Sequence, residues 1–387
     1  MTQAFDVLIV GGGVVGLTAA LAMAQRNYQV ALIDSGSLTA DTSIVDLRVY
    51  AINKASQALL SQLAVWPHLD AVRLSPYHHM HVWDGINGAA IDFDSRSIGA
   101  ANLGFIIEEA LLKNALLAQI KSQPQIHLFP QQSINEVINL ADNIRIGSAQ
   151  NSWQGQLLMI ADGAHSPTRQ KLQVDMHSWP YNQHALVATV ACEKSHQHTA
   201  YQVFNPQGPL AFLPLVDPRQ CSIVWSTEPN HAKHLMKIDA QEFNNELTHA
   251  FGEKLGQVQL ISERHHFPLH MRHVKQYSGS HWMIMGDAAH TIHPLAGLGL
   301  NVGLADVAAW LKCLDAHKGT LNGRKVLGSY QRERKNAVWQ TIALMEGFKR
   351  IFSHSALPIS ALRGLGLRAC NELTPLKRLF IQHAAGL

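Results

Sequence analysis

Three glycines near the N-terminus have the spacing of a phosphate-binding turn. Gly11, Gly13 and Gly16 form the pattern G-x-G-x-x-G, and Asp34 follows 18 residues after the last of them. In such a turn the first glycine permits the sharp bend, the second lets the backbone approach a pyrophosphate, and the third packs a helix on a strand. A carboxylate in the place of Asp34 can accept hydrogen bonds from a ribose. The pattern predicts a nucleotide site, and by itself leaves FAD and NAD equally open.

The elements around these glycines have the order that such a site needs. Residues Asp6–Val10 predict a strand, Leu17–Arg26 a helix, and Tyr28–Ile33 a second strand, which gives a β-α-β unit. A signal peptide is the alternative for this uncharged region, but Asp6 stands where a basic segment is required and no Lys or Arg comes before it. We expect no targeting segment, and no apolar stretch is long enough to predict a membrane span.

Two further pairs of Asp and Gly follow predicted strands. Asp162 and Gly163 come after Leu157–Ile160, and Gly286 and Asp287 come after Met283–Met285. Ligands of open α/β folds bind at this carboxyl edge of the strands. Both aspartates could instead cap a helix N-terminus. We favour the cofactor role for each of them.

Together these motifs resemble the flavin-dependent aromatic hydroxylases of the para-hydroxybenzoate hydroxylase type, which are class A FAD monooxygenases. The resemblance implies that Asp162 and Gly163 lie near the flavin and the path of the pyridine nucleotide, and that Asp287 contacts the ribityl chain. It also implies that a turn before the last helix of the motif approaches the pyrimidine end of the flavin, through Gly297, Leu298, Gly299, Leu300 and Asn301. The family usually has glutamine where this chain has Leu298, which puts full activity in question.

The resemblance extends over nearly the whole chain to the ubiquinone-biosynthesis hydroxylases, and within them it is strongest to the branch that acts on carbon five of the polyprenylphenol ring. The matching segments are Leu47–Asn53, Gly208–Leu215 and Gly286–Pro294, and the first of them makes Arg48 a predicted flavin contact. The implied reaction uses NAD(P)H, O2 and a flavin hydroperoxide. The chemistry is carried by the flavin, so no side chain is assigned as catalytic. Residues expected near the substrate are His293, Pro294, Phe212, Pro214 and Trp225. Phe212 and Trp225 could equally be core residues, and His293 could equally make a structural hydrogen bond.

The sequence predicts an α/β protein with three parts. A Rossmann-like FAD-binding domain comprises residues 1–75, 100–180 and 275–335. A mostly antiparallel sheet, the substrate domain, is inserted as residues 76–99 and 181–274, where apolar and polar residues alternate. Residues 336–387 are expected to form C-terminal helices.

Charge is distributed unevenly along the 387 residues. The net charge is +3, yet residues 321–387 hold 11 basic and 3 acidic residues, a net charge of +8, against −5 for the remainder. A nucleic-acid-binding body would spread basic residues over its whole binding face, so we expect no nucleic-acid partner. The basic segment is expected either to contact an anionic membrane surface or a lipid-handling protein complex, or to be a solvated face that packs on the acidic body.

The cysteines and histidines predict no further site. Four scattered cysteines favour reduced thiols and a cytoplasmic protein, peripheral at the inner face of the membrane if the basic segment binds lipid. Two histidine clusters, His78, His79 and His81 and then His265 and His266, lack acids or cysteines at ligand spacing, so we expect no metal. Rival functions are a flavin dehydrogenase or oxidase of the same fold and a weakly active assembly subunit. The sequence leaves open whether the protein forms a homo-oligomer.

Overall fold

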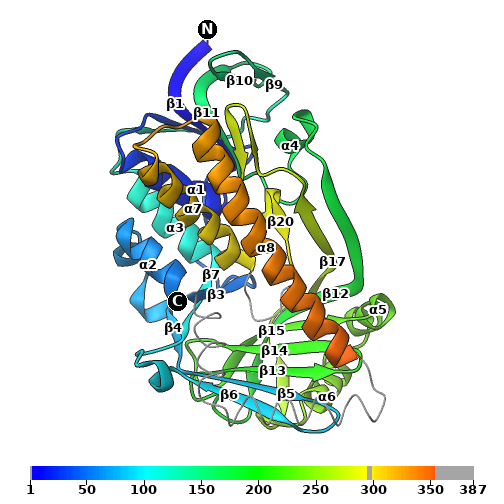
Figure 1. Ribbon diagram of the computed structural model, residues 1–387. Helices are drawn as coiled ribbons and strands as arrows, with labels where there is room; N and C mark the ends of the chain where they lie inside the picture. Colours follow the sequence, from blue (N-terminus) through cyan, green and yellow to red (C-terminus); the bar gives the residue numbers. More distant parts are fainter. Residues whose placement is uncertain (1, 294–298, 354–387) are drawn as a thin grey trace.

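The structure, a computed structural model, describes residues 2–293 and 299–353 (Figure 1). Their strands form three sheets of eight, nine and three strands. In Figure 1 the eight-stranded sheet and its helices lie at the top and the nine-stranded sheet at the bottom. This arrangement confirms the predicted α/β fold with an inserted, mostly antiparallel sheet.

The eight-stranded sheet has a parallel centre. Its strands are, in spatial order, β18 (Ser278–Gly279), β19 (Trp282–Ile284), β11 (Ser152–Ile160), β1 (Thr2–Val10), β2 (Val30–Ile33) and β8 (Ile126–Phe129), with β10 (Ile144–Gly147) and β9 (Glu136–Asn139) attached beside β11. The strands from β19 to β8 are parallel to one another. Val7–Val10 and Val30–Ile33 are buried throughout, as expected for parallel strands covered on both faces.

Helices cover this sheet. α1 (Val14–Ala24) is buried along nearly its whole length, because it packs against both α3 (Glu109–Ile120) and α7 (Gly299–Ala316). The shorter helices of this half are α2 (Lys54–Gln62), α4 (Pro167–Lys171), η1 (Trp66–His68), η2 (Ala71–Arg73) and η4 (Gly286–Ala288). A helix that is apolar on all sides, as α1 is, belongs in a core. It therefore holds the glycine turn at its N-terminus in a fixed place.

The nine-stranded sheet is antiparallel except where β13 pairs with β5. It contains β20 (His290–Thr291), β17 (His265–Val274), β12 (Met176–Cys192), β15 (Gln220–Thr227), β14 (Gly208–Pro214), β13 (Thr199–Asn205), β5 (His79–Asp84) and β6 (Ala90–Asp94), with β16 (Val258–Leu260) beside β12. Two helices, α5 (Pro229–Lys237) and α6 (Ala240–Ala250), lie near it at the bottom of Figure 1. The small third sheet is β3 (Val49–Asn53), β7 (Gly104–Glu108) and β4 (Ser75–Tyr77), and η3 (Ser95–Ile98) follows β6.

One strand contributes to both large cores. The first half of β12 packs with the core of the eight-stranded sheet through Trp179 and Ala185, and its second half packs under α6 through Leu186 and Val190. Its register shifts between Pro180 and His184, an irregularity of the kind that bends a strand. The two halves of the molecule are thus joined by continuous β-structure, visible as the long strand at the right of Figure 1.

The helix α8 (Arg324–Ser353) crosses the front of the molecule (Figure 1). It packs on α7 and reaches β13 in the nine-stranded sheet. Two of the expected domain limits, after residues 180 and 335, fall inside β12 and α8, and the division into domains stays a prediction. No helix among the described residues is long and apolar enough to cross a membrane.

Candidate active site

A cavity of about 1560 Å³ extends from the N-terminus of α1 to the inner face of the nine-stranded sheet. At one end it is lined by Gly11, Gly13 and Asp34. Arg48, Asp162, Gly163, Gly286, Asp287, Gly299 and Leu300 also line it. Segments that lie far apart in the sequence are therefore brought to one surface. Most of the predicted cofactor residues within the described ranges belong to this surface.

The N-terminus of α1 is built to receive an anion. No side chain caps this helix, so the N–H groups of its first turn make no capping contact and are available to a ligand in the cavity. Gly11 has φ +115°, and a Cβ at this position would lie 2.3 Å from the carbonyl oxygen of Ala161; one at Gly16 would lie 1.9 Å from the carbonyl oxygen of Gly11. The glycines are required for β1, α1 and β11 to meet this closely. These features fit the diphosphate of a dinucleotide.

Asp34 directly follows β2 at the same edge of the sheet. Its carboxylate accepts hydrogen bonds from the N–H of Gly12 at 2.5 Å and from the N–H of Gly36 at 2.7 Å. These two bonds hold the side chain beside the glycine turn, where it lines the cavity. Its role toward a ribose stays a prediction, and the position suits that role.

Asp162 contacts the first turn of α4 and also lines the cavity. One carboxylate oxygen accepts a hydrogen bond from the N–H of Thr168 in α4 at 3.1 Å, although the N-cap of that helix is Ser166. The other oxygen is buried at the cavity wall and has no hydrogen-bond partner among the described residues. A buried carboxylate oxygen without a partner is costly. A polar ligand in the cavity would satisfy it.

The turn that carries Asp287 is held by a buried ionic network. Asp306 of α7 is fully buried and accepts hydrogen bonds from the N–H of Gly286 at 2.8 Å, from Nε2 of His290 at 2.7 Å and from Nε of Arg334 at 2.6 Å. Burial would raise the pKa of Asp306, but His290 and Arg334 lower it more, so its pKa lies below the usual value. Three elements, η4, α7 and α8, are thereby tied together behind the cavity. The exposed side chain of Asp287 lies on the cavity side of this turn.

A second fixed group flanks this turn. Nε of Arg48 lies 2.9 Å from Oε2 of Glu109, and the hydroxyl of Tyr50 donates to the same oxygen at 3.0 Å. Burial raises the pKa of Tyr50, so its hydroxyl is neutral at physiological pH. All three residues line the cavity. The resemblance predicted Arg48. Tyr50 lies in the same segment, Leu47–Asn53, but was not singled out, and Glu109 lies outside every motif.

The side chain of Asn301, a predicted flavin contact, forms hydrogen bonds with the backbone of β3. Its side-chain amide donates to the carbonyl oxygen of Ala51 at 2.7 Å, and its Oδ1 accepts from the N–H of Asn53 at 3.0 Å. The first turn of α7 is thus fixed to β3, the strand that follows Arg48. Gly299 and Leu300 line the cavity beside it, whereas Gly297 and Leu298 lie outside the described residues.

The far wall of the cavity is largely apolar. It is formed by alternate residues of the strands, among them Tyr77, Met80, Leu213, Val224, Phe267 and Leu269. His265 and Tyr201 add polar atoms to this wall. His265 belongs to the second histidine cluster, for which the sequence predicted no metal. In β14 and in Ile223–Trp225 of β15, apolar residues occupy both faces, so the sequence could not show which face lines the cavity.

Two residues expected near the substrate lie in the core instead. Phe212 and Trp225 are buried on the opposite face of the sheet, in the core beneath α6, and the ring of Phe212 stacks on Phe251 with centroids 3.7 Å apart. Alternation along β14 and β15 explains this, since their neighbours Leu213 and Val224 face the cavity. The structure thus favours the core interpretation, which the sequence had left open.

The remaining substrate candidates do not form part of the described cavity wall. Pro214 is buried at the end of β14 and is not among the lining residues. His293 is buried, hydrogen-bonds through Nε2 to Oε1 of Gln183 at 3.1 Å, and packs edge-on against Tyr181, which agrees with the structural alternative. Pro294 lies outside the described residues.

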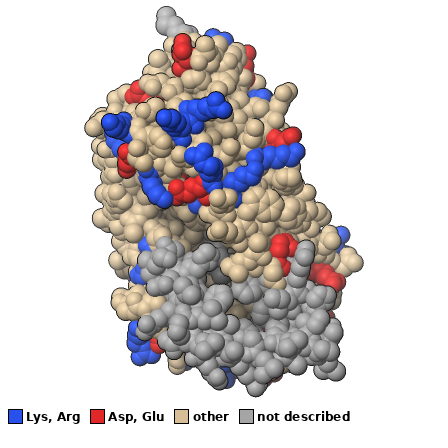
Figure 2. Space-filling view, viewed as in Figure 1, with Lys and Arg blue, Asp and Glu red and all other residues tan. Residues whose placement is uncertain are grey.

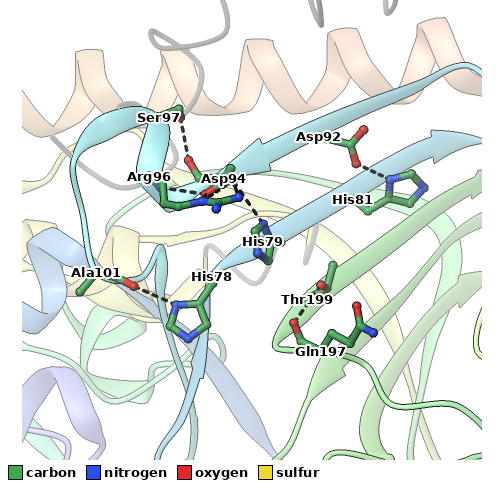
Figure 3. A network of polar contacts seen from close by, with 10 residues as sticks. All are labelled: His78, His79, His81, Asp92, Asp94, Arg96, Ser97, Ala101, Gln197 and Thr199. Carbon is green, nitrogen blue, oxygen red and sulfur yellow. Dashed lines mark hydrogen bonds and ion pairs between the residues drawn. The ribbon is translucent and has the colours of Figure 1, made fainter.

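The first histidine cluster pairs with acids of the neighbouring strand (Figure 3). Nδ1 of His81 lies 2.6 Å from Asp92, and Nδ1 of His79 lies 3.8 Å from Asp94, whereas His78 bonds to the carbonyl oxygen of Ala101 at 2.8 Å. These are cross-strand pairs between β5 and β6. Within the described ranges, the three imidazoles do not converge on one point.

Replacing Asp287 with alanine is expected to weaken FAD binding about 10-fold to 150-fold, since a hydrogen bond to a charged group contributes about 1.5–3 kcal/mol. The measurement is the dissociation constant of FAD, from flavin fluorescence on titration of the apoprotein. Asp175→Ala, which removes an exposed acid paired with Lys275, is the matched control. Equal FAD affinity in both variants would remove the role of Asp287.

Comparison with known proteins agrees with this site. The model of the family described as "FAD binding domain" matches residues 4–344. The chain is 33% identical to the 3-demethoxyubiquinol 3-hydroxylase of Escherichia coli K12, over 100% of this chain and 99% of that protein. It is 32% identical to the ubiquinone hydroxylase UbiL of Rhodospirillum rubrum, over 98% and 89%.

A similar fold is found in the crystal structure of p-nitrophenol 4-monooxygenase PnpA from Pseudomonas putida DLL-E4, with a TM-score of 0.82, 18% identity, and coverage of 99% of this chain and 98% of that one. At this identity the likeness concerns the fold alone. The sequence matches extend over the described glycine turn, the Asp287 turn and the cavity wall between them. The uncapped helix, the unpartnered Asp162 oxygen and these matches lead to one conclusion: the chain belongs to the FAD-binding family of monooxygenases that includes the ubiquinone hydroxylases.

Proposed function

We propose that this protein is an FAD-dependent monooxygenase that uses NAD(P)H and O2 to hydroxylate the aromatic ring of a polyprenylphenol in ubiquinone biosynthesis. The observation that carries the proposal is the single cavity surface that joins a dinucleotide site to an apolar wall. The names of the relatives, a demethoxyubiquinol hydroxylase and a ubiquinone hydroxylase, support the substrate class.

FAD would be held by residues from four segments. The turn at Gly11–Gly16 and the N-terminus of α1 would bind the diphosphate of FAD, and Asp34 would bind its ribose. Asp162 would lie near the flavin, and Asp287 would contact the ribityl chain. Bound FAD would supply the electron transfer and oxygen chemistry that amino-acid side chains lack. Arg48, fixed by Glu109, places a positive charge at the same wall.

The chain itself positions the substrate and excludes water. An apolar wall favours burial of a prenylated ring and its chain. It also excludes water, which would otherwise cause side reactions. The neutral hydroxyls of Tyr50 and Tyr201 and the imidazole of His265 are the polar groups that could orient a phenol at this wall. For Tyr50 and Tyr201, burial raises the pKa, so these hydroxyls can donate hydrogen bonds.

The test is incorporation of labelled oxygen. The FAD-loaded protein is given NAD(P)H, ¹⁸O2 and a short-chain prenylated phenol, and we expect the product to gain one ¹⁸O atom. A flavin dehydrogenase or oxidase would turn over without incorporating the label. An assembly subunit would show no phenol-stimulated NAD(P)H oxidation. Either result would contradict the proposal.

Ring position is a finer part of the proposal. The resemblance implied carbon five, and the two relatives reported above are not named for that position. Growth rescue of strains that lack individual ring hydroxylases, with the quinone intermediates identified by mass, would assign it. Accumulation of the carbon-five product only would support the implied branch.

We propose further that the protein is cytoplasmic and meets its lipid substrate at an anionic membrane surface. Basic side chains gather on the upper part of the face that α8 crosses (Figure 2). The described part of α8 exposes Arg324, Lys325, Arg332 and Lys335. The described cysteines, Cys192, Cys221 and Cys313, are free thiols, which fits a reducing compartment.

Vesicle co-sedimentation tests this surface. We expect binding to anionic but not to neutral vesicles, with a loss at high salt, because each basic residue near such a membrane contributes about 1 kcal/mol. A variant with Gln at the four exposed basic positions of α8 should bind much less. Equal binding of the two proteins, or none, would favour a solvated basic face.

A further inference from the structure

Donor atoms of one histidine of α5 and two glutamates of α6 lie close together, and a second histidine of α5 contacts one of these glutamates. His231 and His234 are three residues apart on α5, and Glu242 and Glu246 are four apart on α6. Residues at these spacings share one face of a helix. We propose that these four residues form a binding site for a divalent transition-metal ion of the zinc type.

The ligand atoms are already near the distances that a metal requires. One donor atom each of His234, Glu242 and Glu246 lies within 4.8 Å of the others. Nε2 of His234 is 2.8 Å from Oε1 of Glu246, and Nε2 of His231 is 3.2 Å from Oε2 of the same residue. Zinc bonds of about 2.0–2.1 Å imply ligand atoms about 3.3 Å apart in a tetrahedron. His234 and His231 contact different oxygens of Glu246, so binding of one ion would turn both imidazoles toward a common point.

A buried hydroxyl orients one of the imidazoles. Oγ1 of Thr227 lies 2.8 Å from Nδ1 of His231, and Thr227 is fully buried. This contact turns Nε2 of His231 toward Glu246. Metal-binding histidines usually have such a partner on the other ring nitrogen. Thr227 therefore occupies the position of an outer residue that fixes the ligand.

The charge of the cluster suits a cation. Glu246 lies within ion-pair distance of both imidazoles, and Glu242 adds a second carboxylate from the same helix. Imidazole nitrogen together with carboxylate oxygen is a ligand set that zinc, nickel and copper accept. Two carboxylates would neutralise a doubly charged ion.

The site is separate from the FAD cavity. None of its four residues lines that cavity, and the buried side chains of Leu235 and Phe243 lie in the core between these helices and the sheet. A bound ion would cross-link α5 and α6 and stabilise this half of the molecule. For these residues the proposal replaces our expectation that the chain binds no metal. No sequence motif marks these residues, because they come from two separate helices.

The test titrates zinc into the full-length, FAD-loaded protein by calorimetry. We expect one tight equivalent and a higher thermal midpoint with zinc. The double variant His234→Ala/Glu246→Gln should bind this equivalent at least tenfold more weakly, because loss of outer partners alone costs about 10-fold to 100-fold. His249→Ala, which removes another exposed histidine of α6, is the matched control and should bind like the parent.

Two further measurements guard against a folding artefact. Thr227→Val should weaken zinc binding by about tenfold or more while leaving the four ligands in place. Copper bound in the same position should show coupling to two imidazole nitrogens in electron paramagnetic resonance. Equal zinc affinity in the parent, the double variant and Thr227→Val would overturn the proposal. The four residues would then form only ion pairs between the helices.

Discussion

Asp306→Ala is expected to lower the free energy of unfolding by about 3–5 kcal/mol, the cost of removing one partner from a buried charge pair. In the parent, the fully buried Asp306 accepts hydrogen bonds from Gly286, His290 and Arg334. The substitution leaves the guanidinium of Arg334 buried without its carboxylate. The turn at Gly286–Ala288 also loses its anchor, so FAD affinity should fall with stability. Urea unfolding and FAD titration measure the two effects.

Asp315→Ala is the matched control. Asp315 lies on the same helix but pairs at the surface, with Nη2 of Arg26 at 2.7 Å, and its own side chain is 60% exposed. Exposed pairs of this kind contribute about 0–1 kcal/mol. If the two variants lose the same stability, the buried network does not anchor the turn. FAD affinity should be unchanged in Asp315→Ala.

Asp306 also makes the stability of the parent protein depend on pH, in a direction that follows from its pKa. The pKa of Asp306 is lower in the folded protein than its ordinary value near 3.9, so its contribution to stability is complete above that value. The contribution is lost as the pH falls through the folded-state pKa. Unfolding measured from pH 7 down to pH 3 should show a steeper acid loss in the parent than in Asp306→Ala.

Phe212→Ala is expected to cost about 3–5 kcal/mol of unfolding free energy, the range for deleting a buried aromatic ring. Phe212 is fully buried and stacks on Phe251 beneath α6. The cavity should keep its lining, because Phe212 is on the opposite face of β14. The KM for a phenol substrate should therefore change little once the protein is folded.

Leu213→Ala separates the two faces of the strand. Leu213 lines the cavity, and its truncation should raise the KM for a prenylated phenol and cost less stability. Steady-state kinetics and thermal unfolding of both variants make the comparison. A large KM effect in Phe212→Ala with little change in Leu213→Ala would reverse the assignment of the faces.

The nucleotide half could be predicted from sequence because its chemistry is local. The helix predicted from Leu17 begins at Val14, since the last residue of the glycine turn is already helical. The strand predicted from Asp6 begins at Thr2, because Thr2–Phe5 pair with β11, which sequence cannot show. The motif therefore fixed the element types, and long-range pairing decided their ends.

The substrate half was harder because its information is not local. Phe212 and Leu213 are both apolar, and only the partner of each face shows that one is core and the other cavity wall. Asp306 belongs to no recognised motif, yet it holds Gly286 from a position 20 residues later. The convergence of His231 with Glu246 likewise depends on how α5 and α6 pack.

The strand β12 has a consequence for how the molecule comes apart. It supplies Trp179 to one core and Val190 to the other without an intervening loop. Melting either core would remove the partner of the other half of the same strand, so the two halves should unfold cooperatively. Loss of cofactor contacts at one end of the molecule would therefore lower the heat resistance of the other end.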